Sequence, residues 1–242
     1  MARLIIVRHG NTFDKGDTVT RVGGRTDLPL SASGLAQADA LANHFADTRF
    51  VAAFCSPLMR TRQTARAMIG MHTGAPALIV LPFLTEVDYG PDENQPEDKV
   101  VARIGEAALE AWECDATPPE GWRVDADALR EGWRSLLERA AGLNAEDTAL
   151  IVTSNGIARF LPDVVDVQPD DLDRKLKTGA WGVVEIDGAT SCITSGKFSW
   201  VMPVSATGSS MTKSLSSPTP MVTSRASRRG GELGGSDCVT GC

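Results

Sequence analysis

Four short stretches of the sequence carry the residue types from which a phosphate-binding site is built. The first is Arg8-His9-Gly10-Asn11-Thr12, the second places Arg60 after Ser56-Pro57, the third holds Glu86, and the fourth is Ser154-Asn155-Gly156. Guanidinium groups match the geometry of phosphate oxygens, and a neutral imidazole beside them is a competent nucleophile toward phosphorus. These stretches therefore predict a pocket for a phosphate dianion.

The four stretches follow short apolar runs that are typical of buried strands. These runs cover residues 4–7, 50–55, 77–81 and 148–152. Ligands of open α/β sheets bind at the carboxyl ends of the strands, where these polar residues fall. A fifth strand is predicted over 181–186, and a weaker one over 191–200 follows a turn at Asp187-Gly188.

Helical patterns separate the predicted strands. Ser31 is expected to cap one helix, and Ser56 is expected to cap a second helix that Pro57 opens. The first of these helices has apolar positions at Leu35, Ala38, Leu41 and Phe45. A helix near residue 105 has them at Val100, Ile104, Ala107 and Ala111, and a helix near residue 135 has them at Leu129, Trp133, Leu136 and Ala140. The alternation predicts an α/β fold, a three-layer α/β/α sandwich with a mostly parallel central sheet.

Composition narrows the classes of function. The chain has 242 residues, 42% of them hydrophobic, and a net charge of −7, which suits a globular protein and disfavours a nucleic-acid partner. Because no apolar run approaches the roughly 20 residues of a membrane span, we expect no membrane partner. The five scattered cysteines include no C-x-x-C pair, so we expect a cytoplasmic protein without a metal site or disulfides.

The composition changes near Met202. Of the 40 residues in 203–242, 23 are Ser, Thr, Gly or Pro, and no apolar periodicity remains. Such a stretch buries too little surface to offset its ordering entropy. We therefore predict one domain over residues 1–202 and a low-complexity, disordered tail over 203–242.

The stretches resemble the histidine phosphatase superfamily, also called phosphoglycerate mutase-like, over residues 3 to about 187. The resemblance rests on Arg8-His9-Gly10, Thr12, Gly24-Arg25-Thr26-Asp27-Leu28-Pro29-Leu30-Ser31, Gly34, Gln37-Ala38, Ser56-Pro57-Leu58, Arg60 and Gln63-Thr64-Ala65, in that order. It implies that His9 is the phosphorylated nucleophile, that Arg8 and Arg60 clamp the phosphate, and that Glu86 protonates the leaving oxygen. It further implies that Asn11, Thr12 and Arg25 line the pocket.

One departure from the family pattern bears on activity. Members carry a second histidine in a Ser-His-Gly sequence where this chain has Ser154-Asn155-Gly156, and the other two histidines, His44 and His72, are expected to be structural. Asn155 is expected to contact the ligand or to cap a helix. An amide can donate to a phosphate oxygen but cannot carry charge or move a proton. Loss of one preorganised donor typically costs about 10²–10³ in rate, so exchange for a neutral donor predicts a partial loss.

Two further departures bear on the substrate. Where the family often continues Gly-x-x-Glu-Gly after the acid, this chain has Gly90-Pro91-Asp92-Glu93-Asn94. The segment 97–120 is acidic, with few cations beyond Lys99 and Arg103, whereas in phosphoglycerate mutases this region supplies basic residues for a second anionic group. These departures disfavour a mutase that acts on a doubly anionic sugar acid, and they favour hydrolysis.

The resemblance thus implies a metal-independent phosphatase without a cofactor, which hydrolyses a small phosphomonoester through phosphorylated His9. The alternative, favoured by Asn155, is a phospho-ligand or phosphoprotein binding module that has lost turnover. A mutase-type phosphotransferase is a third and weaker alternative. The expected partner is a small phosphorylated substrate, and the sequence does not predict an oligomeric state.

Overall fold

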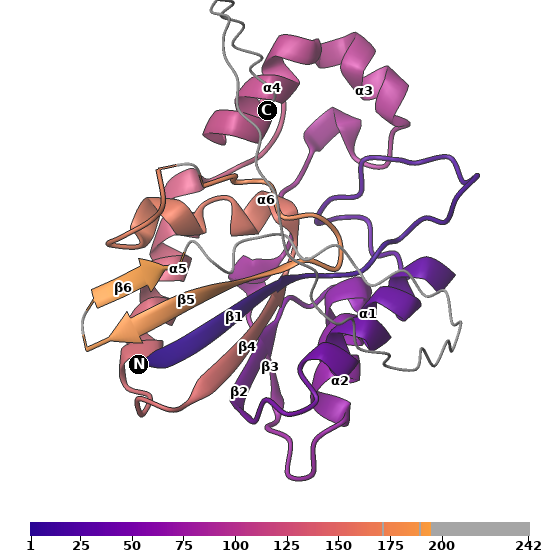
Figure 1. Ribbon diagram of the computed structural model, residues 1–242. Coiled ribbons are helices and arrows are strands. Elements are labelled where there is room, and N and C mark those ends of the chain that lie inside the picture. Colours follow the sequence, from indigo (N-terminus) through magenta and orange to yellow (C-terminus); the bar gives the residue numbers. More distant parts are fainter. Residues whose placement is uncertain (171, 189, 195–242) are drawn as a thin grey trace, which may run out of the picture. The chain divides into compact units, whose positions relative to one another are not determined.

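A mostly parallel sheet forms the centre of the computed structural model, which describes residues 1–170, 172–188 and 190–194 (Figure 1). Its strands are β1 (Ala2–Arg8), β2 (Phe50–Cys55), β3 (Leu78–Val80), β4 (Thr148–Thr153), β5 (Trp181–Asp187) and β6 (Thr190–Ile193). Their order is β3-β2-β4-β1-β5-β6, in which the first four run parallel and the last two pair antiparallel. The prediction of a mostly parallel sheet is confirmed. The weaker strand predicted over 191–200 is present as β6, while its predicted residues 195–200 and the predicted tail lie outside the described residues.

Helices cover both faces of this sheet and its upper edge. They are α1 (Ala32–His44), α2 (Met59–Gly70), α3 (Glu97–Ile104), α4 (Glu106–Asp115), α5 (Ala126–Ala141) and α6 (Asn155–Ala158), with short 3-10 turns at Pro82–Leu84, Gly90–Asp92 and Leu161–Val164. Figure 1 shows α3 and α4 above the sheet, on the side toward which the parallel strands run. None of the described helices has the length and apolarity needed to cross a membrane.

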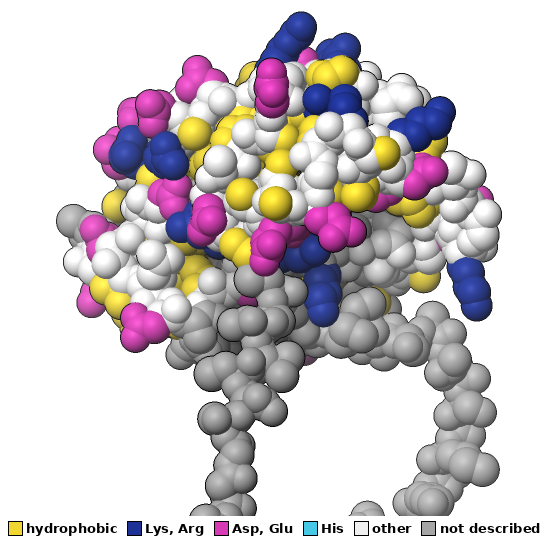
Figure 2. Space-filling view, turned by 90° about the horizontal axis from the view of Figure 1, so that it is seen from above, with side chains coloured by type: hydrophobic (Ala, Val, Ile, Leu, Met, Phe, Trp, Pro, Cys, Tyr) yellow, Lys and Arg dark blue, Asp and Glu magenta, His cyan; other side chains and the backbone are white. Residues whose placement is uncertain are grey.

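Alternate residues of the strands fill two separate cores. Ile5 and Val7 of β1 pack with the apolar sides of α1 and α2, whereas Leu4 and Ile6 belong to the core that also contains Trp133 of α5. This alternation follows from the period of two along a strand. Burial on both faces explains why the parallel strands read as nearly continuous apolar runs. Outside these cores, acidic and basic side chains are interspersed on the face seen in Figure 2.

The start of α1 agrees with its prediction, whereas one of its apolar positions does not. Ser31 Oγ accepts a hydrogen bond from the backbone N–H of Gly34 at 3.2 Å, as expected of an N-cap. Leu35, however, is 48% exposed, and Ala42 is buried instead. The buried side of the helix is therefore rotated away from Leu35, toward Ala38 and Ala42.

The predicted start of α2 is wrong by two residues. The helix begins at Met59, whose N–H donates to Asp27 Oδ1 at 2.6 Å, so its cap comes from a residue distant in the sequence. Ser56 instead lies 2.6 Å, Oγ to Oγ, from Thr61. A periodicity-based reading could not find this cap, because Asp27 reaches the helix only through tertiary structure.

The single helix predicted around residue 105 is two helices. Gly105 has φ +81, a left-handed conformation that ends α3 and begins α4. Glycine adopts this conformation without steric cost, so the apolar period of three and four continues across a break in the helix. As a result α3 and α4 form a bent pair above the sheet.

Candidate active site

The loop after β1 is held against the beginning of α1. The backbone N–H of His9 donates to the carbonyl of Thr153 at 3.1 Å, which joins the carboxyl ends of β1 and β4. A Cβ added to Gly10 would lie 2.4 Å from the carbonyl oxygen of Gly34, and one added to Gly34 would lie 2.0 Å from that of Asn11. Glycine at both positions thus permits a backbone-to-backbone approach that fixes His9 at the strand end.

Two hydrogen bonds determine the tautomer of His9. Its Nδ1 lies 2.7 Å from the carbonyl oxygen of Gly10, which can only accept, so Nδ1 carries the proton. Its Nε2 lies 3.2 Å from Nε of Arg60, which can only donate, so Nε2 presents a lone pair. Both contacts select the same neutral tautomer, with the nucleophilic nitrogen toward the arginine.

The electrostatics of the site keep this ring neutral. Burial lowers the pKa of His9 well below its usual value, and the positive charges of Arg60 and Arg8 lower it further. The hydrogen bond to Gly10 acts in the opposite direction but does not outweigh them. His9 is therefore unprotonated, and able to act as a nucleophile, near neutral pH.

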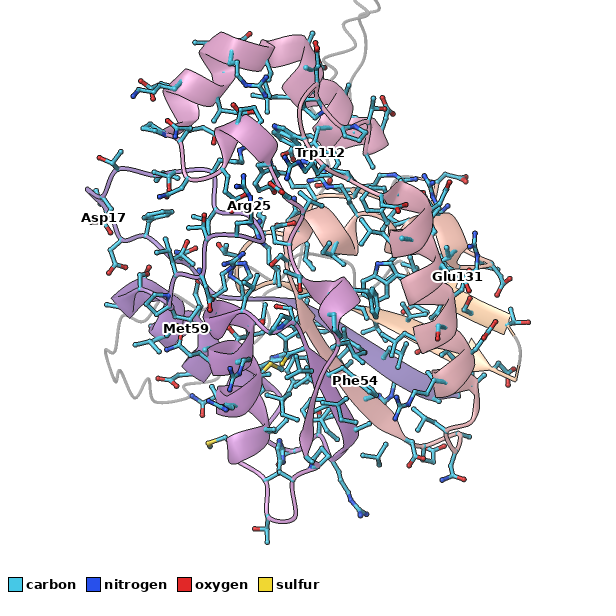
Figure 3. The ribbon with its side chains drawn as sticks, turned by 180° about the vertical axis from the view of Figure 1, so that it is seen from behind. Asp17, Arg25, Phe54, Met59, Trp112 and Glu131 are labelled. Carbon is cyan, nitrogen blue, oxygen red and sulfur yellow. The ribbon has the colours of Figure 1, made fainter. Side chains whose placement is uncertain are left out.

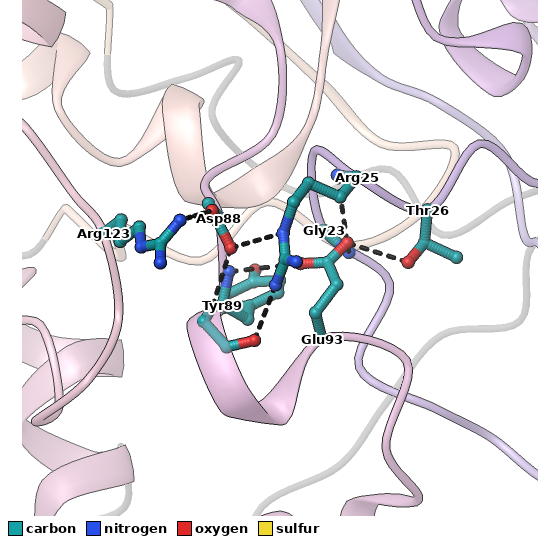
Figure 4. Close-up of polar contacts among 8 residues, drawn as sticks. Gly23, Arg25, Thr26, Asp88, Tyr89, Glu93 and Arg123 are labelled. Carbon is teal, nitrogen blue, oxygen red and sulfur yellow. Dashed lines mark hydrogen bonds and ion pairs between the residues drawn. The ribbon is translucent and has the colours of Figure 1, made fainter.

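Arg60 is oriented by the loop over residues 23–26. Its Nη1 donates to the carbonyl of Thr26 at 2.8 Å and its Nη2 to that of Gly23 at 3.1 Å. Glu93 in turn holds this loop, since its Oε1 accepts from the backbone N–H of Gly23 at 3.1 Å, that of Arg25 at 3.0 Å and the hydroxyl of Thr26 at 2.8 Å (Figure 4). The position of the Arg60 guanidinium beside His9 thus depends on the carboxylate of Glu93, which holds the loop to which Arg60 donates.

The backbone of one residue, Leu176, positions Arg8 and Asn155 together. Nη1 of Arg8 donates to the carbonyl of Leu176 at 2.6 Å, and the N–H of Leu176 donates to Oδ1 of Asn155 at 2.7 Å. Ser154, rather than Asn155, is the N-cap residue of α6, so the helix-capping alternative for Asn155 is wrong. Because Oδ1 is engaged, the Nδ2 of Asn155 remains as a donor. Nε of Arg8 is buried and has no hydrogen-bond partner among the described residues.

Glu86 is buried and fixed by two backbone groups. Its Oε1 accepts from the N–H of Val87 at 2.9 Å, and its Oε2 accepts from the N–H of Gly156 at 3.2 Å. A Cβ on Gly156 would lie only 2.1 Å from Oε1 of Glu86. The carboxylate therefore occupies space that only a glycine leaves at the start of α6.

A cavity of about 380 Å³ brings most of the predicted site residues together. Among the residues that line it are Arg8, His9, Asn11, Thr12, Arg60, Glu86 and Asn155. Nδ2 of Asn11 donates to Ser33 Oγ at 3.2 Å, which fixes that side chain at the rim. No three His, Cys, Asp or Glu side chains within residues 1–170, 172–188 and 190–194 lie close enough to hold a metal ion.

Arg25 does not line this cavity, so its predicted place in the pocket is wrong. Its Nε donates to Oδ1 of Asp88 at 2.9 Å and its Nη2 to the carbonyl of Gly90 at 2.6 Å, and Arg123 pairs with the same aspartate (Figure 4). The side chain is 54% exposed. Its backbone N–H, by contrast, helps to hold the loop that orients Arg60.

The cavity contains three cations that the sequence patterns did not predict: Arg21, Arg159 and Lys175. Arg21 pairs with Glu97 of α3, and its guanidinium carbon lies 5.4 Å from the ring centre of Tyr89. Arg159 follows Asn155 by four residues, a spacing that places both on one side of a helical turn and could have indicated it. These cations come from segments other than 97–120, which contributes the carboxylates Glu97 and Glu113 to the cavity.

These features define a class: an α/β protein with a histidine, two arginines and a glutamate at the carboxyl ends of parallel strands. Residues 4–195 match the family model of the histidine phosphatase superfamily (branch 1), and the chain belongs to this superfamily.

Curated relatives agree with this membership. The chain is 35% identical over 127 residues to fructose-2,6-bisphosphatase TIGAR of Xenopus laevis, a match over 50% of this chain and 44% of that protein. It therefore spans less than half the length of that relative. It is 27% identical over 179 residues to 2,3-bisphosphoglycerate-dependent phosphoglycerate mutase 2 of Gloeobacter violaceus, over 72% of this chain and 80% of that protein.

Solved structures agree with the fold. A phosphoglycerate mutase of Bacillus anthracis superposes with a TM-score of 0.67 at 18% identity, over 83% of this chain and 95% of that one. A putative alpha-ribazole-5'-P phosphatase of Escherichia coli gives 0.61 at 21% identity, over 80% and 94%. The predicted three-layer, phosphoglycerate mutase-like architecture is confirmed.

Proposed function

We propose that this chain hydrolyses a small phosphomonoester through a phosphohistidine formed on Nε2 of His9. The observation that carries the proposal is the tautomer of His9, which two independent hydrogen bonds select. Arg8 and Arg60 line the same cavity and supply the donors that a phosphoryl group needs. The names of the relatives, a bisphosphatase, a phosphatase and mutases, describe phosphoryl chemistry of this kind.

The proposed reaction has two displacements at phosphorus. In the first, Nε2 of His9 bonds to phosphorus, the bond to the leaving oxygen breaks, and Glu86 gives that oxygen a proton. In the second, water bonds to phosphorus, the N–P bond breaks, and Glu86 takes the proton of the water. Arg8 and Arg60 bind the non-bridging oxygens in both steps, so the proposal needs neither a metal nor a cofactor.

Asn155 has a supporting role in this proposal. It stands where the superfamily pattern has a second histidine, and its Nδ2 would donate to a phosphoryl oxygen while Oδ1 stays on Leu176. A fixed neutral donor stabilises developing charge less than an imidazolium does. Restoring the histidine with Asn155→His should therefore raise kcat, by less than the about 10²–10³ that follows complete removal of such a donor.

A phosphoenzyme trap tests the proposal directly. A labelled phosphomonoester panel, quenched during turnover, should leave acid-labile, base-stable phosphate on the full chain. His9→Ala should abolish the label, whereas His44→Gln and His72→Gln, which change the other two histidines, should retain it. Label that survives His9→Ala would contradict the proposal.

A second candidate, a phospho-ligand binding module without turnover, is favoured by the uncharged Asn155. It predicts micromolar phosphoester binding, no product over the whole panel, and no label on His9. Turnover within about tenfold of the Asn155→His variant would exclude this candidate, since tenfold is only about 1.4 kcal/mol of activation free energy. Phosphate transfer to a second hydroxyl without release would indicate the mutase alternative.

A further inference from the structure

Arg159 is a buried cation whose donors are only partly used. The residue is 1% exposed, its Nη1 donates to the carbonyl of Trp112 in α4, and its guanidinium carbon lies 4.2 Å from the centre of the Trp112 ring. In Figure 3 the labelled Trp112, a residue of α4, lies on the side of that helix that faces the sheet. Nε and Nη2 of Arg159 have no hydrogen-bond partner among the described residues. Buried charged donors without acceptors are costly, which points to a missing anionic partner.

A second cation and one carboxylate complete a cluster with Arg159. Oε1 of Glu113 lies 3.9 Å from Nη2 of Arg159, too far for a hydrogen bond, and Oε2 lies 3.0 Å from Nζ of Lys175. Two positive charges thus share one negative charge. The side chains of Glu113 and Lys175 are 28% and 51% exposed, so both can move without disturbing the core.

This cluster lines the cavity of His9 but has its own set of partners. Arg8 and Arg60 bond to the carbonyls of residues 176, 26 and 23, whereas Arg159 and Lys175 face Glu113 and the carbonyl of residue 112. The phosphoryl end of the cavity therefore does not use the surplus positive charge of the cluster.

We propose that Arg159 and Lys175 form a second anion subsite, and that the substrate is a phosphomonoester carrying a further carboxylate or phosphate. Glu113 occupies this subsite in the free protein and yields it to the ligand, which then accepts from Nη2 of Arg159 and from Lys175. The inference rests on the proposed function, because it places the phosphoryl group at His9.

Binding of matched phosphonates tests the subsite without any turnover. The probes are ω-carboxyalkyl phosphonates of increasing chain length and their carboxamides, which match them in shape but lack the second charge. Calorimetry on the full chain should give a carboxylate over amide preference of about tenfold or more for at least one length, as expected of hydrogen bonds to charged groups.

Three variants assign the preference to the cluster. Arg159→Gln should bring the ratio close to one while the amide still binds, and Lys175→Gln should lower it about two- to fivefold, as for an exposed pair. Glu113→Gln should raise the ratio, because the competing carboxylate is gone. Arg134→Gln, which removes an exposed cation of α5 outside the cavity, should leave the ratio unchanged.

The outcomes separate this inference from the proposed function. Equal binding of carboxylate and amide at every length, or a preference that survives both Arg159→Gln and Lys175→Gln, would overturn the subsite. Equal weakening of both probes by Arg159→Gln would assign Arg159 to the phosphoryl group or to the structure instead. If no phosphate label forms on His9 while the carboxylate preference remains, the proposed hydrolysis is contradicted and the second anion subsite is retained.

Discussion

A single methyl group at residue 156 should displace the candidate general acid. A Cβ on Gly156 would lie 2.1 Å from Oε1, 3.0 Å from Cδ of Glu86 and 3.3 Å from Cγ2 of Val87. Real Cβ atoms do not approach an oxygen so closely, so the carboxylate of Glu86 must rotate away. It would then lose the hydrogen bond that Oε2 accepts from the N–H of Gly156 at 3.2 Å.

The size of the effect follows from burial. Glu86 is 7% exposed but lines the cavity, so its carboxylate would be displaced toward the cavity and away from the two backbone N–H groups that hold it. Overpacking of this kind costs about 1–3 kcal/mol of unfolding free energy. If Glu86 protonates the leaving oxygen, its displacement should also lower kcat by about 10²–10⁴, the usual contribution of a general acid.

The assay compares leaving groups. Gly156→Ala should slow hydrolysis of an alkyl phosphate far more than that of a nitrophenyl phosphate, because a good leaving group needs little protonation. Glu86→Gln should give the same pattern. Gly70→Ala is the matched control, since nothing lies within 4 Å of a Cβ at the end of α2. It should leave kcat unchanged and raise stability by at most about 1 kcal/mol.

Two results would refute this reasoning. If Gly156→Ala and wild type hydrolyse the alkyl phosphate at similar rates while Glu86→Gln is slow, the carboxylate does not act from its observed position. If both variants lower the rates on the two esters equally, Glu86 has a role other than proton donation.

Three other perturbations have defined outcomes. Glu93→Ala releases the loop that orients Arg60, and should raise the inhibition constant of phosphate about 5- to 30-fold, or about 1–2 kcal/mol; an unchanged constant would contradict this link. Asp92→Asn weakens the ion pair with Arg103, whose side chain is 36% exposed, and should lower the free energy of unfolding by about 1–2 kcal/mol, seen as a lower Tm, with kcat little changed. Because the pKa of His9 is depressed by folding, the unfolded chain gains a proton below about pH 6.5 that the native chain does not. The free energy of unfolding should therefore fall with decreasing pH by up to about 1.4 kcal/mol per unit, and His9→Gln should remove that slope in a Tm series.

The strands could be predicted from the sequence because their burial is local information. Residues 50–55 and 148–153 are apolar runs since each strand has a helix on both sides, and β2 occupies the predicted residues. Helix boundaries were less predictable. The cap of α2 comes from Asp27, and the break at Gly105 leaves the apolar period intact. Both depend on backbone conformation or distant contacts that periodicity does not contain.

Predicting the site from strand ends succeeds most directly for residues at or immediately after the end of a strand, although Arg60 and Glu86, which lie further along the chain, also line the cavity. His9, Arg8 and Asn155 meet this condition, because the carboxyl ends of β1 and β4 are adjacent. Lys175 does not, since it reaches the cavity from a long irregular segment. Arg25 was predicted to line the pocket but does not line the cavity. Only its backbone N–H contributes, by bonding to Glu93 and so holding the loop that orients Arg60.

The structure explains how residues 90–94 can differ from the Gly-x-x-Glu-Gly pattern of the family and still hold the loop over residues 23–26. Glu93 keeps the glutamate that holds the loop at residues 23–26, and Asn94, where the pattern has glycine, has φ +57. Asparagine tolerates this left-handed conformation better than other side chains do. Its Oδ1 also accepts from the hydroxyl of Thr20 at 2.9 Å. This departure therefore preserves the backbone geometry that positions Arg60.

We propose that Asn155, unlike Asn94, departs from the family pattern in charge rather than in backbone shape. The carbonyl of Leu176 accepts from Arg8 and its N–H donates to Asn155, so the backbone of one residue sets the position of a permanent cation and of a neutral donor. An imidazole at 155 could be protonated beside a phosphate, whereas the amide cannot. The cavity nevertheless holds five cations, Arg8, Arg21, Arg60, Arg159 and Lys175, against the carboxylates Glu86, Glu97 and Glu113. A surplus of positive charge therefore persists without a histidine at residue 155. We expect the missing titratable group to lower the rate of proton transfer, and so kcat, more than it weakens binding of the phosphate dianion.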